Sequence, residues 1–409
     1  MNRKPPVSSL LVAAIMLLLW SPVSAAEPLG FSISTDVPLR ELSADFCWFH
    51  PRAAAIPGAG KNGGPAVILT LQKHLQASDH YSGLSFMRTD DLGATWTAPV
   101  LPPELDWQKE SDAVDIAVCD VTPGWHAPTQ KLIAIGTKLR YSRTGEQLTE
   151  VPGGYQCAYA VYDPATNDWQ AWKLLETPHL EDKYFQLAPG CVQWLVKPDG
   201  TLLVPCYIKG PTGSDYAATM LLCRFDGETL SFVEAGDEIG MAGGRGICEP
   251  SLAYYDGRYY LTLRNDDGAY VTTGDDGLHF APMTPWKFDD GTDLGSYNTQ
   301  QHWLVHSGGL FLSYTRRGAN NDHIFRNRAP LFIAQVDPQT LTVMRATEQV
   351  AIPDRGAPLG NFGACAITAE ESWITDAEYI LSDIPDPRGA DGSVWVSRIR
   401  WSQPNILSP

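Results

Sequence analysis

The chain has 409 residues, with 30 lysines and arginines against 47 aspartates and glutamates, which gives a formal charge of −17. This acidic balance disfavours nucleic acid and anionic membrane surfaces as partners. The eight cysteines show neither C-x-x-C nor Cys/His spacing, so they indicate neither a zinc site nor a small disulfide scaffold. We therefore expect no metal and no cofactor, and the pairing of the cysteines stays open.

The first 26 residues have the pattern of a signal peptide. Arg3 and Lys4 precede an apolar run from Leu10 to Trp20, and small residues end at Ala26. The run is too short for a comfortable membrane span, and no later stretch is longer. We expect residues 1–26 to be removed, residues 27–409 to form a single domain without a membrane anchor, and the product to be secreted or periplasmic.

The sequence of residues 27–409 predicts an all-β fold. One strand is expected to start at His50-Pro51-Arg52, and a second, Ala66–Gln72, leads into the loop that contains Asp79. In an up-and-down meander the start of strand one lies beside the end of strand two. Arg52 and Asp79 are therefore predicted to meet. A turn motif, Thr89–Trp96, follows and joins two strands.

A second meander is the clearest repeat unit of the chain. We predict strands over Ser251–Tyr255, Arg258–Arg264, Ala269–Thr273 and His279–Met283, which is the size of one propeller blade. By the same rule, Glu249 before its first strand and Arg264 at the end of its second are neighbours. In the next blade Tyr297 and Arg316 should complete the same rim. A copy of the turn motif stands at Thr273–Phe280.

We predict the number of blades from the number of hairpins that contain the turn motif. Weaker versions of the turn motif occur at 162–169, 225–232 and 336–343, which makes five hairpins with the two stronger ones. A final strand near Val394–Trp401 could pair with residues 30–35 and close a ring. The prediction is a six-bladed β-propeller of four-stranded antiparallel meanders, with a seventh blade between 97 and 160 as the alternative.

The two turn motifs, Thr89–Trp96 and Thr273–Phe280, fit the Asp-box pattern S/T-x-D-x-G-x-T-W, and the chain thereby resembles the sialidase superfamily of β-propellers. The resemblance implies a glycoside hydrolase that releases terminal acidic sugars such as sialic acid from glycans. By motif position it implies that Asp79 is the acid, Glu249 the base and Tyr297 the nucleophile. It also implies that arginines hold the substrate carboxylate, with Arg52, Arg264 and Arg316 as candidates.

Tyrosine suits such a substrate because a carboxylate nucleophile would be repelled by the carboxylate on the anomeric carbon. No arginine lies between Arg264 and Tyr297, where the family's third arginine is expected. Its identity is open among Arg316, Arg317, Arg326 and Arg328.

Two other functions remain open at this point. Histidine-dependent propeller rhamnosidases and polysaccharide lyases are similar overall, and His50 beside Arg52 would suit chemistry on a uronic acid, as substrate-binding residue or base. Further histidines for that reading are His74, His80, His302 and His323. A carbohydrate-binding propeller without catalysis would keep the turn motifs but lack converging catalytic groups.

Overall fold

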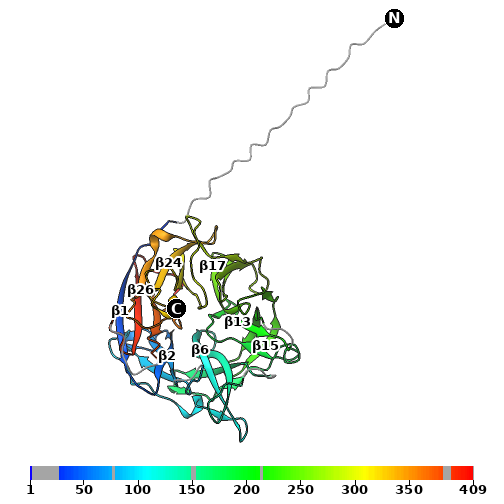
Figure 1. Cartoon of the computed structure of the whole chain (residues 1–409), viewed down its shortest axis with the longest axis vertical. Helices are drawn as coiled ribbons and strands as arrows, with labels where there is room; N and C mark the ends of the chain where they lie inside the picture. The colour runs from blue at the N-terminus through cyan, green and yellow to red at the C-terminus, as the bar shows by residue number, and fades with distance from the viewer. Residues whose placement is uncertain (2–26, 76–78, 149–152, 212–214, 381–387, 409) are drawn as a thin grey trace.

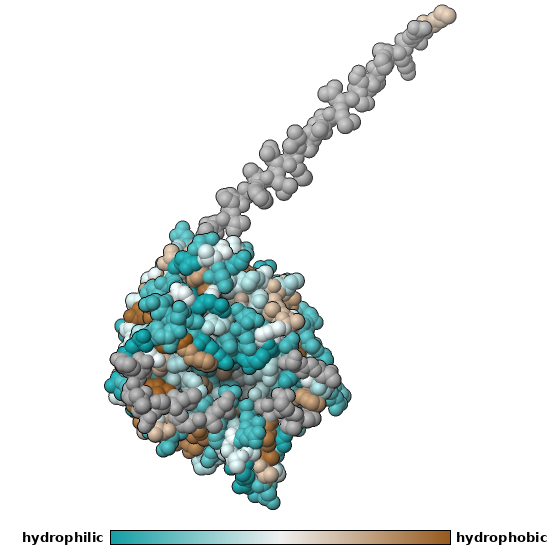
Figure 2. Space-filling model, in the orientation of Figure 1, coloured by the Kyte–Doolittle hydropathy of each residue, from teal (hydrophilic) through white to brown (hydrophobic). Residues whose placement is uncertain are grey.

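The computed structural model describes residues 1, 27–75, 79–148, 153–211, 215–380 and 388–408, and the predicted signal peptide lies almost entirely outside them. The described chain forms six small sheets of mainly antiparallel strands. Figure 1 shows these sheets arranged in a ring, as a six-bladed β-propeller. The face in view is largely hydrophilic (Figure 2), as expected for an acidic chain. No helix in the described part of the chain is long and apolar enough to span a membrane.

The first three blades follow one another along the chain. Their strands are β2 (Cys47–Ile56), β3 (Ala66–His74) and β4 (Ser85–Thr89); β5 (Gln108–Lys109), β6 (Val114–His126), β7 (Lys131–Ser142), β8 (Gln156–Asp163), β9 (Asp168–Trp169) and β10 (Lys173–Leu174); and β11 (Gln186–Ala188), β12 (Leu195–Val196), β13 (Leu202–Lys209), β14 (Ala217–Phe225), β15 (Leu230–Ala235) and β16 (Ile239–Gly240).

The other three blades complete the ring. They are β17 (Cys248–Tyr255), β18 (Arg258–Arg264), β19 (Ala269–Gly274) and β20 (Thr284–Pro285); β21 (Lys287–Phe288), β22 (His302–His306), β23 (Gly309–Tyr314), β24 (Leu331–Asp337), β25 (Thr342–Val343) and β26 (Gln349–Ile352); and β27 (Gly363–Ala366), β28 (Glu371–Ala377) and β29 (Ser393–Trp401), to which β1 (Phe31–Arg40) is added. Short 3-10 turns lie at Lys61–Gly63, Pro103–Leu105, Phe325–Asn327 and Arg345–Thr347.

Closure of the ring joins the two ends of the described chain. Strand β1 pairs antiparallel with β29, from Phe31 opposite Trp401 to Arg40 opposite Ser393. This confirms the predicted partner for the final strand. The described residues between 97 and 160 belong to the second blade and to the segment that links it to the first, so the seventh-blade alternative is wrong.

The core lies between neighbouring blades. Ile133 and Tyr159 of the second blade pack with Val204 and Leu221 of the third, for example. A strand covered on both faces reads as a continuous apolar run, which is why β3 contains Ala-Val-Ile-Leu instead of an alternating pattern.

The hairpin turns are stabilised by aspartate carboxylates that accept hydrogen bonds from backbone N–H groups within the turn. Asp91 accepts from the Thr95 amide at 2.8 Å, and Asp163, Asp226 and Asp337 make similar contacts in the weaker hairpins. Gly93 and Gly277 have positive φ, as expected. In the second motif the accepting carboxylate is Asp276, because Asp275 is solvent-exposed.

Two strand predictions need correction. The fourth strand of the β17–β20 blade is Thr284–Pro285 and not His279–Met283. Residues 279–283 belong to the arm of the turn that follows Gly277, and in this segment only the Ala281 amide donates a backbone hydrogen bond to Thr273. The first blade has three strands, and its fourth position is held only by an isolated bridge between Phe86 and Val100.

Candidate active site

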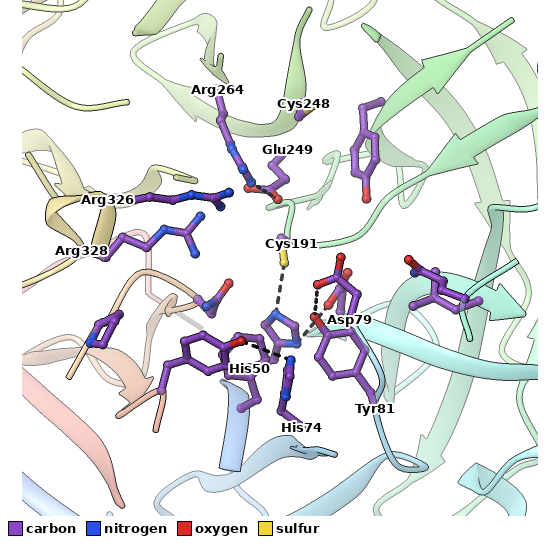
Figure 3. Close-up of a pocket in the computed structure, with 18 of the residues that line it drawn as sticks. His50, His74, Asp79, Tyr81, Cys191, Cys248, Glu249, Arg264, Arg326 and Arg328 are labelled. Atoms are coloured by element: carbon purple, nitrogen blue, oxygen red, sulfur yellow. Dashed lines mark hydrogen bonds and ion pairs between the residues drawn. The ribbon is translucent and has the colours of Figure 1, made fainter. Parts of the chain in front are cut away.

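A cavity of about 810 Å³ opens at one end of the ring, and its lining comes from all six blades (Figure 3). A volume of this size is typical of small-ligand sites. The lining is mostly polar and charged. His50, His74, Tyr81 and Asp79 lie on one side, and Arg264, Arg326 and Arg328 lie on the other.

The floor of the cavity is built by residues in an unusual backbone conformation. His50, Asp120, Cys191 and Glu249 all have positive φ, between 42° and 57°, in or just before the inner strands of four consecutive blades. Strand register shifts at three of them, as in a β-bulge. A bulge re-aims a side chain, and such strain in residues other than glycine concentrates at functional sites.

Three of these floor residues contact one another in a chain. The His50 Nδ1 atom lies 3.0 Å from Asp120 Oδ1, and its Nε2 atom lies 3.6 Å from Cys191 Sγ. His50 and Cys191 are buried, with 3% and 4% of their surfaces exposed. Burial alone would raise the pKa of Asp120, but the neighbouring His50 and Arg52 lower it. Asp120 is therefore ionised, and its charge stabilises a positive charge on the His50 ring.

The same three side chains could hold a metal ion. Their ligand atoms all lie within 4.8 Å of one another, and imidazole, thiolate and carboxylate together suit Zn²⁺. However, His50 already directs one ring nitrogen to Asp120 and the other to Cys191. Only one of those nitrogens would face a shared ion.

Two further acid–base pairs border the floor. Tyr81 donates its hydroxyl to Asp79 Oδ1 at 3.0 Å, and desolvation and the charge of Asp120 raise the pKa of Asp79. The His74 Nε2 atom lies 3.4 Å from the Tyr379 hydroxyl. Burial and the nearby His50 lower the pKa of His74 to about 4, and burial raises that of Tyr379 to about 12. At neutral pH both members of this second pair are uncharged.

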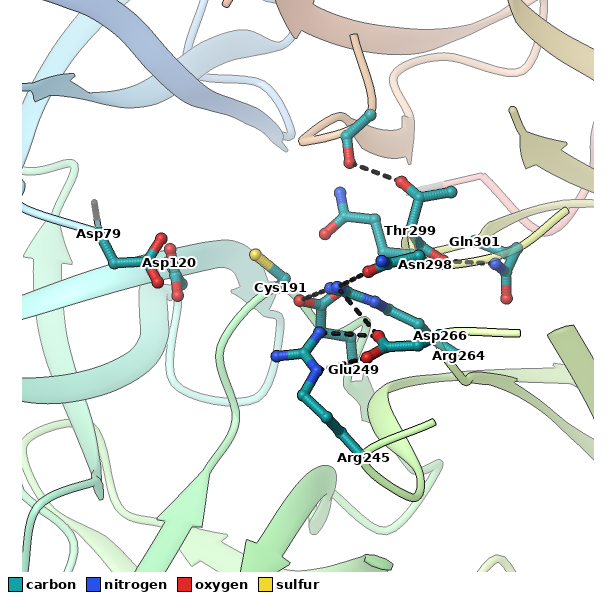
Figure 4. A network of polar contacts seen from close by, with 12 residues as sticks. Asp79, Asp120, Cys191, Arg245, Glu249, Arg264, Asp266, Asn298, Thr299 and Gln301 are labelled. Carbon is teal, nitrogen blue, oxygen red and sulfur yellow. Dashed lines mark hydrogen bonds and ion pairs between the residues drawn. The ribbon is translucent and has the colours of Figure 1, made fainter. Parts of the chain in front are cut away.

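The opposite side of the cavity carries two arginine–carboxylate pairs (Figure 4). Arg264 donates one Nη to Glu249 and the other to Asn298 Oδ1 at 2.6 Å. Arg245 binds Asp266 through two contacts of 2.6 and 2.8 Å. Only 8% of the Arg264 side chain is exposed, against 51% for Arg245. The inner pair is therefore part of the packed wall, whereas the outer one lies at the rim.

Two more arginines face the cavity without such compensation. Among the described residues, no carboxylate lies within ion-pair distance of Arg326 or Arg328. Arg328 is 9% exposed and donates only to the Asn298 carbonyl, at 2.6 Å. Burial and the like charge of Arg264 lower the pKa of Arg328 to about 10, and the pKa of Arg326 is lowered for the same two reasons. This surplus of positive charge favours an anionic ligand.

Four of the predicted site residues line this cavity. They are His50, Asp79, Glu249 and Arg264, and the predicted Glu249–Arg264 contact is confirmed. Figure 3 shows Asp79 on the side away from the arginines.

The other three predicted site residues do not line the cavity. The predicted meeting of Arg52 with Asp79 is wrong, because Arg52 lies one bulge deeper and donates to Val121 O, Phe362 O and Gln300 Oε1. Arg52 contributes instead to a pocket at the opposite end of the ring.

Tyr297 and Arg316 also lie elsewhere. The Tyr297 hydroxyl donates to Asn327 Oδ1 at 2.7 Å, and the Arg317 guanidinium covers the tyrosine ring at 3.9 Å. Arg316 binds Glu348 and stacks over Phe332. Neither side chain reaches the cavity.

The site contains groups that sequence reasoning did not single out. Asp120, Cys191, Tyr81 and Tyr379 are among them. The rule that the start of strand one lies beside the end of strand two, called the rim rule below, placed His50 and Glu249 at the site. The same rule would also have found Asp120 and Cys191 if the inner strands of the second and third blades had been located. Of the other histidines considered, His74 lines the cavity, His302 lines the opposite pocket, and neither His80 nor His323 lines either.

Comparison with solved structures defines the fold class. The chain is similar to Trypanosoma rangeli sialidase in complex with a difluoro-KDN, with 13% identity and a TM-score of 0.58 over 90% of this chain and 58% of that one. A Hadza microbial sialidase gives 13% identity and a TM-score of 0.60, covering 87% and 66%. A variant of the NanB sialidase from Streptococcus pneumoniae gives 12% and 0.57, covering 89% and 70%.

The chain thus spans less than two thirds of the first of these structures. Its fold is that of the sialidase-like six-bladed β-propellers. Comparisons at the level of sequence find no matching family model and no similar curated protein.

Proposed function

We propose that this protein is an enzyme that hydrolyses the glycosidic bond of a terminal acidic sugar, such as a sialic acid or a uronic acid. The observation that carries the proposal is the division of one cavity into two sides. Arg326 and Arg328 have no carboxylate partner among the described residues, and acid–base groups face them across the floor. The sialidase-like fold supports the same class of substrate.

The arginine side provides the binding. A guanidinium presents N–H groups that match both oxygens of a carboxylate, and burial strengthens the interaction. Arg264 is already committed to Glu249 and Asn298, so Arg326 and Arg328 are the groups available to the ligand. A carboxylate bound between them would also offset the cost of burying the charge of Arg328.

The acid–base roles follow from two aspartates whose pKa values are shifted apart. The raised pKa of Asp79 keeps a proton on its carboxyl group at higher pH, which suits a general acid that protonates the leaving oxygen. The lowered pKa of Asp120 keeps it ionised beside His50. The Asp120–His50 pair then serves as the general base that activates the attacking group.

A second reaction is favoured by one specific observation, the uncharged His74–Tyr379 pair. The neutral histidine can remove the proton beside a uronate carboxylate that arginines neutralise, and the neutral tyrosine can donate its proton to the leaving oxygen. Elimination would leave an unsaturated sugar, whereas hydrolysis would not.

The experiment is turnover of purified protein on paired glycosides that differ only in the carboxylate: sialosides, glucuronides and galacturonides, each with its neutral counterpart. We expect release only from acidic members, without new absorbance near 235 nm, and loss of that release in Asp79→Asn. Absorbance growth lost in Tyr379→Phe would replace hydrolysis by elimination. Equal turnover of neutral counterparts, or binding without turnover of any acidic glycoside, would contradict the proposal.

We also propose that the protein is exported after removal of residues 1–26, on the basis of the sequence pattern alone. Mass spectrometry of protein isolated from the native cell envelope and medium tests this. An N-terminus near Glu27 is expected, and an intact N-terminus on cytoplasmic protein would contradict it.

A further inference from the structure

We infer that Cys191 is the nucleophile of this site and that Cys191, His50 and Asp120 form a triad of nucleophile, base and charge-stabilising carboxylate. The inference rests on the proposed function and specifies how the sugar is attacked. It begins from a gap, because the tyrosine expected to attack, Tyr297, uses its hydroxyl in a bond to Asn327 and does not line the cavity.

The contacts follow the order that such a triad requires. His50 Nε2 lies 3.6 Å from the Cys191 sulfur, within hydrogen-bonding range for a thiol, and His50 Nδ1 lies 3.0 Å from the Asp120 carboxylate. The Asp120 carboxylate beside Nδ1 thus stabilises the imidazolium that forms when Nε2 accepts the thiol proton. Because the two contacts use different nitrogens of the His50 ring, they can exist at the same time.

The backbone prepares this arrangement at a cost in free energy. All three residues have positive φ, at 51°, 56° and 57°, although none is glycine. Each such conformation costs about 1 to 3 kcal/mol and persists where surrounding structure imposes it. The three strained residues come from three different blades, and their side chains converge on one another.

The position of the sulfur fits an attack between the two sides of the cavity. Figure 3 places Cys191 between Glu249 on the arginine side and His50, with Asp79 further along the same floor. Burial raises the pKa of the Cys191 thiol, so it is neutral before attack and is not repelled by a sugar carboxylate. A neutral thiol needs a base in contact, and His50 is that base.

The reaction balances in two steps. His50 Nε2 takes the thiol proton, Sγ bonds to the anomeric carbon, the glycosidic C–O bond breaks, and Asp79 gives its proton to the leaving oxygen. Water then attacks the anomeric carbon and gives a proton to Asp79, while the C–S bond breaks and the sulfur recovers its proton from His50. The net change is hydrolysis, and the sugar leaves with retained configuration.

The first test needs no substrate. Native protein is treated with iodoacetamide at pH 7.5 and the alkylated cysteines are mapped by mass spectrometry. Cys248 is the internal reference, since it lines the same cavity and is 6% exposed but makes no contact with a histidine among the described residues. We expect Cys191 to react at least tenfold faster than Cys248, and at least tenfold slower in His50→Gln and in Asp120→Asn. Equal rates at both cysteines, or bound zinc that protects Cys191 until a chelator removes it, would overturn the triad.

The second test uses whichever acidic glycoside is turned over. Cys191→Ala should lose at least 10³-fold in kcat, Cys365→Ser, which changes a thiol in the opposite pocket, should stay within twofold, and rapid quenching should trap the sugar on the Cys191 peptide. Turnover retained in Cys191→Ala overturns this inference and leaves the proposed function standing. Fast, His50-dependent alkylation without turnover of any acidic glycoside supports the triad and refutes the proposed function instead.

Discussion

The two ends of the ring differ sharply, although the same inner strands contribute to both. One end is the polar cavity of about 810 Å³, and the other is a pocket of about 840 Å³ lined largely by apolar groups that include Trp125, Trp194 and Trp303. The floor residues with positive φ lie between the two pockets. Before or at the bulge the inner strands present His50, Asp120 and their counterparts, and after it they present Ala53–Ala55 and Leu252–Tyr254. The difference teaches that chemistry is concentrated where strands enter the ring with strained backbone.

The largest effect expected from a substitution in the polar cavity is on catalysis. Asp79→Asn removes the proton donor and should lower kcat by about 10³-fold, within the usual contribution of a general acid. The measurement is kcat on the best acidic glycoside. Asp112→Asn, whose side chain is fully exposed outside the cavity, is the matched control and should change nothing. Equal losses in the two variants would remove Asp79 from the mechanism.

Next in size is an effect on stability at the arginine wall. Arg264→Gln leaves Glu249 charged and without its partner, and should lower the free energy of unfolding by about 3 to 5 kcal/mol. Arg245→Gln breaks an exposed pair and should cost less than about 1 kcal/mol. Urea unfolding of both variants at pH 7 checks this. A larger loss in Arg245→Gln would reverse the assignment of inner and outer pairs.

A smaller effect concerns pH. The pKa of His74 is about 4 in the folded protein, below the ordinary value near 6.5. Between those values the unfolded chain binds a proton that the folded chain does not, so stability falls as pH falls from 7 to 4. His74→Gln should remove about 2 to 3 kcal/mol of that fall in denaturant unfolding at the two pH values.

The exposed His279 is the control for that experiment. Its hydrogen bond to Asp276 raises its pKa, so its contribution is present at low pH and is lost as pH rises. His279→Gln should therefore leave the acid-induced fall in place. Identical pH dependence of wild type and His74→Gln would contradict the burial of a neutral His74.

The smallest expected effect is at Tyr297. Tyr297→Phe removes only the hydroxyl contact with Asn327, so kcat on the best acidic glycoside should change by less than about twofold. A loss of 10²-fold or more would restore the tyrosine mechanism and show that Tyr297 reaches the substrate.

Much of the fold was predictable because its signals are local. The Asp-containing turns depend on residues three or four apart, and ring closure followed from an otherwise unpartnered strand at each end. The rim rule also found His50 and Glu249, since their strands were located correctly. It failed for Arg52 because a bulge shifts the register between Phe49 and Arg52 and takes the arginine below the floor.

The remaining site residues depend on long-range geometry. Asp120 and Cys191 belong to blades whose inner strands were not located, and positive φ at non-glycine residues has no clear sequence signal. Arg326 and Arg328 were only two of several candidates, because they lie in the irregular segment between β23 and β24. The Tyr297 motif misled for a physical reason, since Asn327 and Arg317 occupy its hydroxyl and ring.

The most direct test of the central claim is calorimetric binding of paired monosaccharides, glucuronate against glucose and sialic acid against its carboxyl-reduced form, to wild type and Arg328→Gln. The account predicts that at least one acid binds at least tenfold more tightly than its neutral counterpart, and that Arg328→Gln abolishes this difference while leaving the melting temperature within a few degrees. Equal affinity of each acid and its neutral counterpart in the wild type would contradict the claim that the uncompensated arginines recognise a sugar carboxylate.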